Sequence, residues 1–352
     1  MDINNLFRLA AEKKASDIHL LSGLNPTLRI DGQLVDINKV VTSGDFSALT
    51  DQDLEAFLDQ IITREQKARF YDKRDLDFGH QIDSYRYRVN LSFEKGSINI
   101  VARIIDNQIP TLEETGLSSV VEDLLNLPQG FILVTGPTGC GKSTTLASMV
   151  GHINKTRRTN IVTLEDPIEY IFTPDKSIIA QRQLGTDMLT FANGLKHVLR
   201  QDPNVIMVGE MRDLETIAAA VTMAETGHLV LATLHTYSAA QTVDRIIDIF
   251  PPHQQNQIKS QLSGALTAVI SQRLLPRISG GRIAAREILL NNDAVSNLIR
   301  EGKVAQITST IETHAGIGMI TMDRNIKQLF QAGEISREVA LRQMNDPDTL
   351  DN

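Results

Sequence analysis

Two different patterns of hydrophobic and polar residues divide the chain. Residues 1–105 mix short alternating segments with amphipathic ones, which predicts a small α+β domain. A helix is expected over 3–14, followed by the strand DIHLL and by the hairpin TLRIDGQLV, which turns at Asp31-Gly32. The polar segment 106–115 contains Pro110 and is typical of a linker or hinge.

Capping and turn signals complete the first domain. Thr50 with Asp53, and Thr63 with Gln66, have the spacing of capping boxes and predict the starts of two helices. The strand patterns DLDFGHQI and YRYRVNLSFEKGSINIVARII follow, with Glu94-Lys95-Gly96 as the turn in the second.

From residue 116 to 352 apolar strands alternate with amphipathic helices, which is typical of an α/β domain with a mostly parallel sheet. The expected strands are FILVTG (131–136), NIVTLED (160–166), NVIMVGE (204–210) and HLVLATLH (228–235). Polar residues end three of them, and the first runs into a glycine-rich loop. Because parallel strands end at one edge of a sheet, these tips are expected to line one site.

Beyond residue 250 the pattern is mainly helical. One interruption, RLLPRISGGRIAAREILL, reads as a hairpin, and the final DPDTLDN is expected to be a disordered tail.

The glycine-rich loop GPTGCGKS (136–143) fits the phosphate-binding pattern G-x-x-x-x-G-K-[ST] between a strand and a helix expected over 142–154. Glycines let backbone N–H groups face phosphates, and the helix N-terminus adds partial positive charge. Lys142 would contact the β- and γ-phosphates of ATP, and the hydroxyl of Ser143 would hold Mg²⁺. The nucleotide contacts are expected from Gly136, Pro137, Thr138, Gly139, Cys140, Gly141, Lys142, Ser143 and Thr144.

Hydrolysis needs a group that orients or deprotonates water. Glu210, after the apolar run NVIMV, is the first candidate, although it could instead pair with Arg212. Glu165 is the second, as a ligand of Mg²⁺ through water or as another base. The competing interpretation is a carboxylate that caps a turn.

Three further side chains have both functional and structural interpretations. His235 and His228 bracket one strand, and each could donate to a γ-phosphate oxygen or be a core histidine. Cys140 is expected to fill space in the loop, with a thiol that reagents could reach in the empty protein.

Composition narrows the class of protein. Hydrophobic residues make up 41% and charged residues 22% of the 352, as in a globular protein of two domains. No apolar run approaches a membrane span, and MDINNLFRLAAEKK lacks the core of a secretion signal, so a cytoplasmic location is expected. The single cysteine excludes an internal disulfide, and a net charge of −8 gives no support to nucleic-acid binding.

The same residues resemble those of the secretion and type IV pilus ATPases, and within them the retraction, or PilT, type. The matching segments are ASDIHL, GPTGCGKSTT, LEDPIEY, LRQDPNVIMVGEMRDLET, TGHLVLATLHT and, near the C-terminus, AVSNLIRE. Asn204 stands where the family usually has Asp, and AVSNLIRE differs from the family motif at its third residue.

The resemblance implies a fold and a set of roles. It implies a PAS-like N-terminal domain and a RecA-like P-loop ATPase domain, assembled as a ring homo-hexamer. Glu210 would be the catalytic glutamate and Glu165 the acid of the Asp box, with His235 and His228 sensing phosphate. Arg88 and Arg103 would reach a nucleotide from the N-terminal domain, or simply form one face of a strand hairpin.

The resemblance also implies a task. The ATPase would act at the cytoplasmic face of the inner membrane, closing and opening its domains about 106–115 to move a platform protein and withdraw pilins. Residues 298–301 would transmit this motion, or form an ordinary packing helix. The alternatives are a pilus-assembly or type II secretion ATPase, an accessory retraction paralogue, a nucleic-acid translocase on the same core, and a nucleotide-binding protein without turnover.

Overall fold

The computed structural model describes residues 2–30, 32–41, 46–83, 85–105, 108–117 and 119–350, which form two compact units. The first contains the described residues up to Gln108 together with Pro167–Ile171, and the second contains Ile109–Asp166 and the described residues from Phe172 onward. Residues 109–115, expected in the linker, thus group with the second unit. Across the described residues, no helix has the length and apolarity needed to span a membrane.

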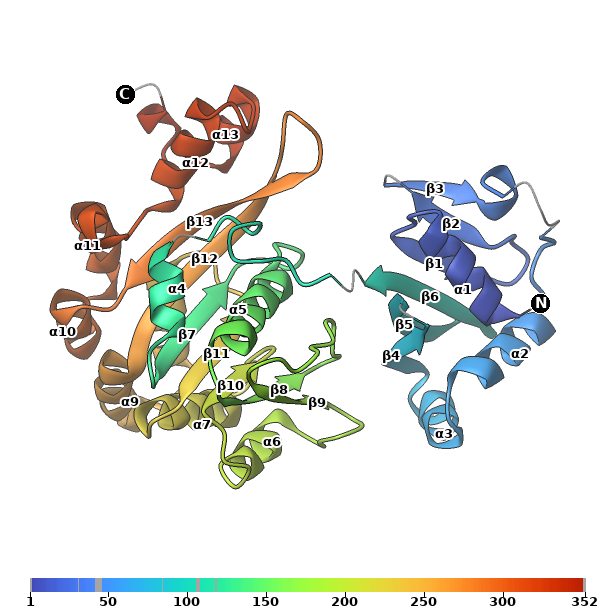
Figure 1. Cartoon of the computed structure of the whole chain (residues 1–352), viewed down its shortest axis with the longest axis horizontal. Coiled ribbons are helices and arrows are strands. Elements are labelled where there is room, and N and C mark those ends of the chain that lie inside the picture. The colour runs from blue at the N-terminus through green and yellow to red at the C-terminus, as the bar shows by residue number, and fades with distance from the viewer. Residues whose placement is uncertain are drawn as a thin grey trace. The chain divides into compact units, whose positions relative to one another are not determined.

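The first unit is built on an antiparallel sheet of order β3-β2-β1-β6-β5-β4 (Figure 1). Its strands are β1 (Asp17–Leu20), β2 (Thr27–Ile30), β3 (Gln33–Asp36), β4 (Asp75–Ile82), β5 (Tyr85–Glu94) and β6 (Ser97–Ile105). Its helices are α1 (Ile3–Glu12), α2 (Asp51–Ile61) and α3 (Arg64–Lys73), with a short 3₁₀ turn η1 (Ile37–Lys39).

Local signals account for these elements. Both capping boxes are confirmed, because Thr50 and Thr63 each exchange hydrogen bonds with the third residue of α2 and α3. Lys95 and Gly96 have φ values of 49° and 90°, as in the tight hairpin turns that match strand twist. The expected turn at Asp31-Gly32 lies partly outside the described residues.

The second unit contains a sheet of order β13-β12-β7-β11-β10-β8-β9, parallel except for β13 (Figure 1). Its strands are β7 (Gly130–Thr135), β8 (Asn160–Glu165), β9 (Ile178–Gln183), β10 (Val205–Val208), β11 (Leu229–Leu234), β12 (Leu266–Pro276) and β13 (Arg282–Leu290). Its helices are α4 (Ser119–Leu125), α5 (Lys142–Thr156), α6 (Phe191–Val198), α7 (Leu214–Glu225), α8 (Ala239–Asp248), α9 (Pro252–Ala265), α10 (Asp293–Glu301), α11 (Ile307–Thr313), α12 (Met322–Gln331) and α13 (Arg337–Gln343).

The four strands expected from apolar runs are the ones at the centre of this sheet. β7, β10 and β11 are buried along their whole length because helices cover both faces. Two features were not expected. β9, an edge strand with a partly exposed pattern, gave no apolar run, and the predicted hairpin joins the main sheet through β12, which pairs with β7.

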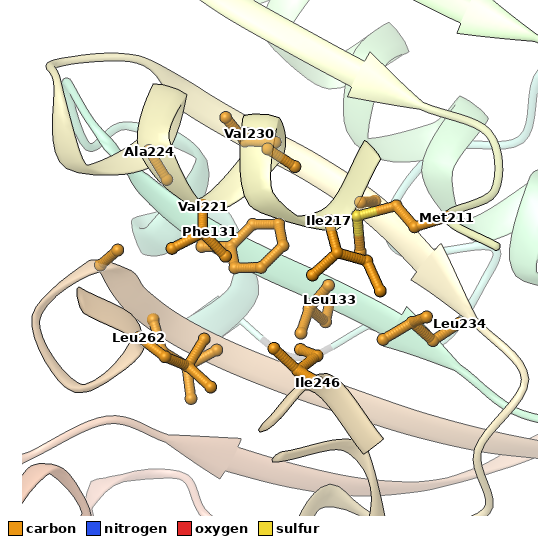
Figure 2. Close-up of a cluster of buried hydrophobic side chains, with 14 of the residues drawn as sticks. Phe131, Leu133, Met211, Ile217, Val221, Ala224, Val230, Leu234, Ile246 and Leu262 are labelled. Atoms are coloured by element: carbon orange, nitrogen blue, oxygen red, sulfur yellow. The ribbon is translucent and has the colours of Figure 1, made fainter. Parts of the chain in front are cut away.

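One large hydrophobic core packs the sheet against α6 to α11. Figure 2 shows part of it, where Phe131 and Leu133 of β7 lie among side chains of α7, β11, α8 and α9. On another face, α5 packs against β7 and β11. The strand that leads into the glycine-rich loop and the helix that leaves it are therefore both fixed by burial.

The C-terminal segment is not a free tail up to residue 350. Leu350 is buried, and Lys327 Nζ donates to the carbonyl oxygen of Thr349 over 3.0 Å. Asp323 accepts from the backbone N–H groups of Asn345 and Asp346. The expectation of disorder from polar composition is thus wrong for residues 346–350, because α12 supplies partners for this backbone.

Candidate nucleotide site

The loop between β7 and α5 has the backbone that phosphate binding requires. Gly139 and Gly141 have φ values of 77° and 89°, which favour glycine. A Cβ at Gly136 would lie 2.3 Å from the carbonyl oxygen of Gln272, so a side chain there would force the backbone apart. No described side chain caps α5 at Gly141, and the helix N-terminus carries partial positive charge that favours an anion.

Gln272 of β12 braces this loop. Its buried Nε2 donates to the carbonyl oxygen of Cys140 over 2.7 Å, and its Oε1 accepts from the Thr145 hydroxyl over 2.9 Å. These two bonds fix the position of the end of the loop relative to the first turn of α5. The sequence pattern did not single out Gln272, because its partners lie 127 and 132 residues away.

Cys140 is inaccessible, contrary to the expectation of a reachable thiol. Its side chain is 2% exposed, and burial raises the pKa of the thiol. The sulfur packs close to Gly136, and Gln272 bonds the carbonyl oxygen of the same cysteine. Cys140 therefore fills space beneath the loop.

Lys142 is folded back on the loop. Its Nζ donates to the carbonyl oxygens of Gly136 and Pro137 over 2.9 and 3.0 Å, and lies 3.5 Å from Nδ1 of His235. The ammonium is thus desolvated and held at the centre of the glycine-rich loop. Ser143, the next residue of α5, is exposed, and Thr144 is half-buried.

Glu210 and His235 meet at the carboxyl edge of the sheet. Glu210 follows β10, His235 follows β11, and the carboxylate Oε1 lies 3.1 Å from His235 Nε2. Arg212 grips the same carboxylate, with Nε 2.7 Å from Oε1 and Nη2 2.8 Å from Oε2. Lys142, His235, Glu210 and Arg212 therefore form one chain of polar contacts.

The electrostatics of this chain keep Glu210 ionised. Burial raises the pKa of Glu210, but the hydrogen bond and charge of Arg212, with the charges of His235 and Lys142, outweigh it and lower the pKa overall. The expected pairing of Glu210 with Arg212 is thus observed, and the same carboxylate also contacts His235, which lies beside Lys142. The catalytic role of Glu210 stays a prediction.

Glu165 ends β8 and is buried. Its Oε1 accepts from the Thr163 hydroxyl over 2.6 Å and from Nε2 of Gln181 over 3.0 Å. These neutral donors hold the carboxylate at the same sheet edge as Glu210, as the strand pattern predicted. Gln181 belongs to β9, the strand that the sequence analysis missed.

The fold does not place His228 beside Lys142, His235 and Glu210. His228 precedes β11, whereas His235 follows it, and the seven residue steps between them span about 23 Å at ~3.3 Å per residue. Its Nδ1 lies 3.0 Å from the carbonyl oxygen of Met223 at the end of α7. Within one subunit, His228 thus lies at the opposite edge of the sheet.

The residues present fit a magnesium ion held partly through water. Ser143 offers an exposed hydroxyl at the start of α5, and Glu165 and Glu210 offer carboxylates at neighbouring strand ends. The described residues contain no group of three or more His, Cys, Asp or Glu placed as a metal cage. Mg²⁺ in nucleotide sites usually keeps several waters and binds few protein ligands, so such a cage is unnecessary.

A cavity of about 880 Å³ opens beside the loop, within the second unit. Gly141 and Thr144 line it from the loop and from α5. Its other walls come from residues 113–116, the β12–β13 hairpin, and the segment from Ala315 to α12. The cavity is large enough to hold a base and ribose attached to phosphates at the loop.

Arg88 and Arg103 lie directly opposite each other on β5 and β6 of the first unit. Arg103 Nε donates to Asp17 over 2.9 Å, and Arg88 lies 3.7 Å from Asp77 and 3.9 Å from Glu169. The two arginines thus lie on one face of a strand hairpin, as the second interpretation of the sequence expected. Their contact with a nucleotide stays a prediction.

The segment 298–301 belongs to α10, whose apolar side packs into the core. Ile299 is fully buried and Leu298 partly so, while Arg300 donates to Asn297 and Glu301 pairs with Lys303. Asn204, the other departure from the family pattern, lies before β10 and accepts from the backbone of Asn160, away from the site.

Comparisons with known proteins agree with this geometry. The sequence profile of the family described as "Type II/IV secretion system protein" matches residues 1–342. The retraction ATPase PilT of Pseudomonas aeruginosa is 43% identical over 351 residues, which cover 99% of this chain and 100% of that protein. A twitching motility protein of Neisseria gonorrhoeae is 41% identical over 350 residues, covering 99% of this chain and 92% of the other.

A solved structure extends the likeness to the fold. The crystal structure of the pilus retraction motor PilT with bound ADP superposes with a TM-score of 0.92 at 41% identity, covering 100% of this chain and 99% of the other. The predicted N-terminal domain and RecA-like ATPase domain are thereby confirmed as the fold class, and the chain belongs to the type II/IV secretion system protein family.

Proposed function

We propose that this protein is an ATP-hydrolysing motor that powers retraction of type IV pili and so supports twitching motility. The observation that carries the proposal is the continuous contact from Lys142 in the phosphate-binding loop through His235 to Glu210. The full-length likeness to a pilus retraction ATPase and to a twitching motility protein supports the biological role.

Lys142 is the residue that exchanges partners when the triphosphate binds. In this structure its ammonium is held by two neutral carbonyl groups. Anionic phosphate oxygens form stronger, charge-assisted bonds, so Lys142 turns from these carbonyls to the β- and γ-phosphates. The N–H groups of the loop and the start of α5 bind the remaining phosphate oxygens.

Glu210 orients and activates the attacking water. Its lowered pKa keeps it ionised at neutral pH, as a group that accepts a proton or a hydrogen bond from water must be. His235 bonds both Glu210 and the lysine region, so it reports to the catalytic glutamate whether a γ-phosphate is present. His228 is proposed to sense phosphate only in an assembly, because within one subunit it lies far from this group.

Ser143 and Glu165 would hold Mg²⁺, Glu165 through a water molecule. When bound, the ion neutralises charge on the phosphate oxygens. Glu165 is kept in place for this by Thr163 and Gln181. The base and ribose of ATP occupy the cavity that Gly141 and Thr144 line.

Arg88 and Arg103 serve a nucleotide of a neighbouring subunit in a homo-hexameric ring. Two arginines directly opposite on adjacent strands present a pair of guanidinium groups, each beside a carboxylate of the same unit. An anionic nucleotide brought against this face would meet both, and a guanidinium there stabilises charge on the transferring phosphoryl group. In the ring, the nucleotide cycle moves an inner-membrane platform protein from its cytoplasmic side.

The test is removal of the gene from its host, followed by complementation. Loss of the motor predicts abundant surface pili with no twitching, restored by the natural gene but not by one carrying Glu210→Gln. The purified Glu210→Gln protein should bind ATP and lose at least ~10²-fold in turnover, whereas Lys142→Ala should lose binding. Absence of pili in the deletion would instead indicate an assembly ATPase, and normal turnover by Glu210→Gln would contradict the catalytic assignment.

A further inference from the structure

Among the described residues, the buried Arg286 has no ion pair with an acidic side chain. Its side chain lies in β13 and is 6% exposed, and burial is the only cause acting on its pKa, which it lowers to about 10. The group is therefore charged at neutral pH. Its Nε is also buried and has no hydrogen-bond partner among the described residues.

The other guanidinium donors grip two successive carbonyl groups. Nη1 donates to the oxygen of Gly116 over 3.0 Å, and Nη2 donates to the oxygen of Thr115 over 2.7 Å. The backbone N–H of Arg286 donates to Asn325 Oδ1 over 2.8 Å, which fixes the strand from which the side chain projects. A planar guanidinium suits this two-point grip, which one ammonium cannot reproduce.

This arrangement is unfavourable for stability by itself. A buried charge is costly unless it is paired and fully hydrogen-bonded, and Arg286 is neither. An apolar side chain at this position of β13 would avoid the cost. The retained arginine is thus better explained by what it holds in place.

What it holds is a wall of the cavity beside the phosphate-binding loop. The segment 111–117 is ordered internally by exchanged bonds between Thr111 and Glu114, and by burial of Leu112 and Leu117. Residues 113–116 line the cavity on one side, and Gly141 and Thr144 line it on another. Arg286 lines the same cavity and joins this segment to the sheet.

We propose that Arg286 is a positioning residue for nucleotide recognition. Its guanidinium group holds residues 111–117 in place as the cavity wall that contacts the base and ribose of ATP. The inference rests on the proposed function, in which the triphosphate occupies the loop at 136–144. Arg286 acts through the segment that it grips and makes no contact with the phosphates.

Two probes separate this role from a general effect on the fold. Arg286→Gln should raise the Kd for Mg-ATP about 10-fold, because a buried two-point contact is lost. The Kd for magnesium and inorganic tripolyphosphate, which lacks base and ribose, should change by less than about twofold. Arg286→Lys should behave like Arg286→Gln, because lysine keeps the charge but cannot donate to both carbonyl groups at once.

Arg273→Ala is the matched control. Arg273 lies on β12, donates to the carbonyl oxygen of Gln343 and to Asn345, and does not line the cavity. It should leave both affinities unchanged. Gly116→Val is the second variant, because Gly116 has a φ of 69° that a β-branched residue tolerates poorly. This substitution displaces the carbonyl group that Arg286 bonds, so it should reproduce the selective loss of affinity for Mg-ATP.

The outcomes are distinct and are measured by titration calorimetry on the full-length assembly. A selective loss for Mg-ATP in both Arg286 variants and in Gly116→Val supports the inference. Equal losses for Mg-ATP and tripolyphosphate, or natural affinity in Arg286→Lys, overturn it while the proposed function stands. Failure of the natural protein to bind either probe would overturn the proposed function itself.

Discussion

At the scale of single residues, polar contacts within the chain hold each charge of the site in place. Lys142 rests on two carbonyl groups, and Glu210 rests on Arg212 and His235. Anionic phosphate oxygens would bind the Lys142 ammonium more strongly than neutral carbonyl groups do, whereas the two-point ion pair of Glu210 with Arg212 is already a strong contact. Arg212 differs from the others, because its side chain is 72% exposed and holds Glu210 through two contacts.

With Glu210 in the proposed catalytic role, we expect Arg212 to set the acid side of the activity profile. Its hydrogen bond and charge lower the pKa of Glu210 against the opposing effect of burial. Removing it by Arg212→Ala raises that pKa, so Glu210 takes up a proton at a higher pH than before. We expect the acid limb of kcat against pH to move to higher pH, measured with saturating Mg-ATP.

Arg212→Lys provides the comparison for that experiment. Lysine keeps the positive charge near Glu210 but loses the two-point contact, so its acid limb should lie between those of the natural protein and Arg212→Ala. An unchanged limb in Arg212→Ala would show that Glu210 is not the group whose ionisation limits turnover.

At the scale of elements, a row of charges crosses four strands of the first unit. Asp17 on β1 lies directly opposite Arg29 on β2 and Arg103 on β6, and Arg103 lies opposite Arg88 on β5. Asp17 is 6% exposed, and it pairs with both of its arginine neighbours. One carboxylate thus stabilises the register of β2-β1-β6.

The stability of the first unit should therefore depend on Asp17 and on pH. Burial raises the pKa of Asp17, but the bonds from Arg103 and Ser16 lower it overall. The contribution is thus fully present above the unfolded pKa of ~3.9 and is lost as pH falls through the folded pKa. Asp17→Asn should lower the free energy of unfolding by about 1–2 kcal/mol at pH 7, and by less near pH 3.

Tyrosine fluorescence can follow this transition in the full-length chain. The sequence has no tryptophan and five tyrosines, of which Tyr71, Tyr85, Tyr87 and Tyr170 belong to the first unit. Asp77→Asn is the control, because Asp77 is half exposed and lies 3.7 Å from Arg88, so its loss should cost little. Equal effects of the two substitutions at every pH would contradict the special role of Asp17.

At the scale of the whole molecule, the lysine and the arginines lie in different compact units. Lys142 belongs to the second unit, and Arg88 and Arg103 belong to the first. In the proposed ring, a complete site needs the lysine of one subunit and the arginines of the next. This makes activity a property of the interface between two copies.

Mixing inactive subunits tests this sharing. Lys142→Ala and Arg103→Ala rings should each be inactive, but rings assembled from equal amounts should recover. In a random mixture about a quarter of the interfaces combine an intact lysine with an intact arginine. We expect ATPase activity of that order per site, measured after mass spectrometry has verified mixed rings. No recovery in such rings would place lysine and arginine of one site in the same subunit.

Local signals made much of this protein predictable. The capping boxes at Thr50 and Thr63 and the four apolar strands were correct because each depends on neighbours in the chain. The glycine-rich loop between a strand and a helix was correct for the same reason, and the resemblance to retraction ATPases was confirmed over the full chain. β9 was missed because an edge strand is only partly buried and carries no continuous apolar run.

The sequence alone determined which elements form and which residue types stand at the strand tips, because hydrophobic period, capping and glycine content act over a few residues. Only the tertiary structure decided which of these side chains meet. It joined Glu210 to His235 and Lys142, placed His228 at the far end of β11, and buried the side chain of Cys140. It also revealed Arg286 and its grip on Thr115 and Gly116, because contacts between residues about 170 positions apart depend on how the sheet is ordered.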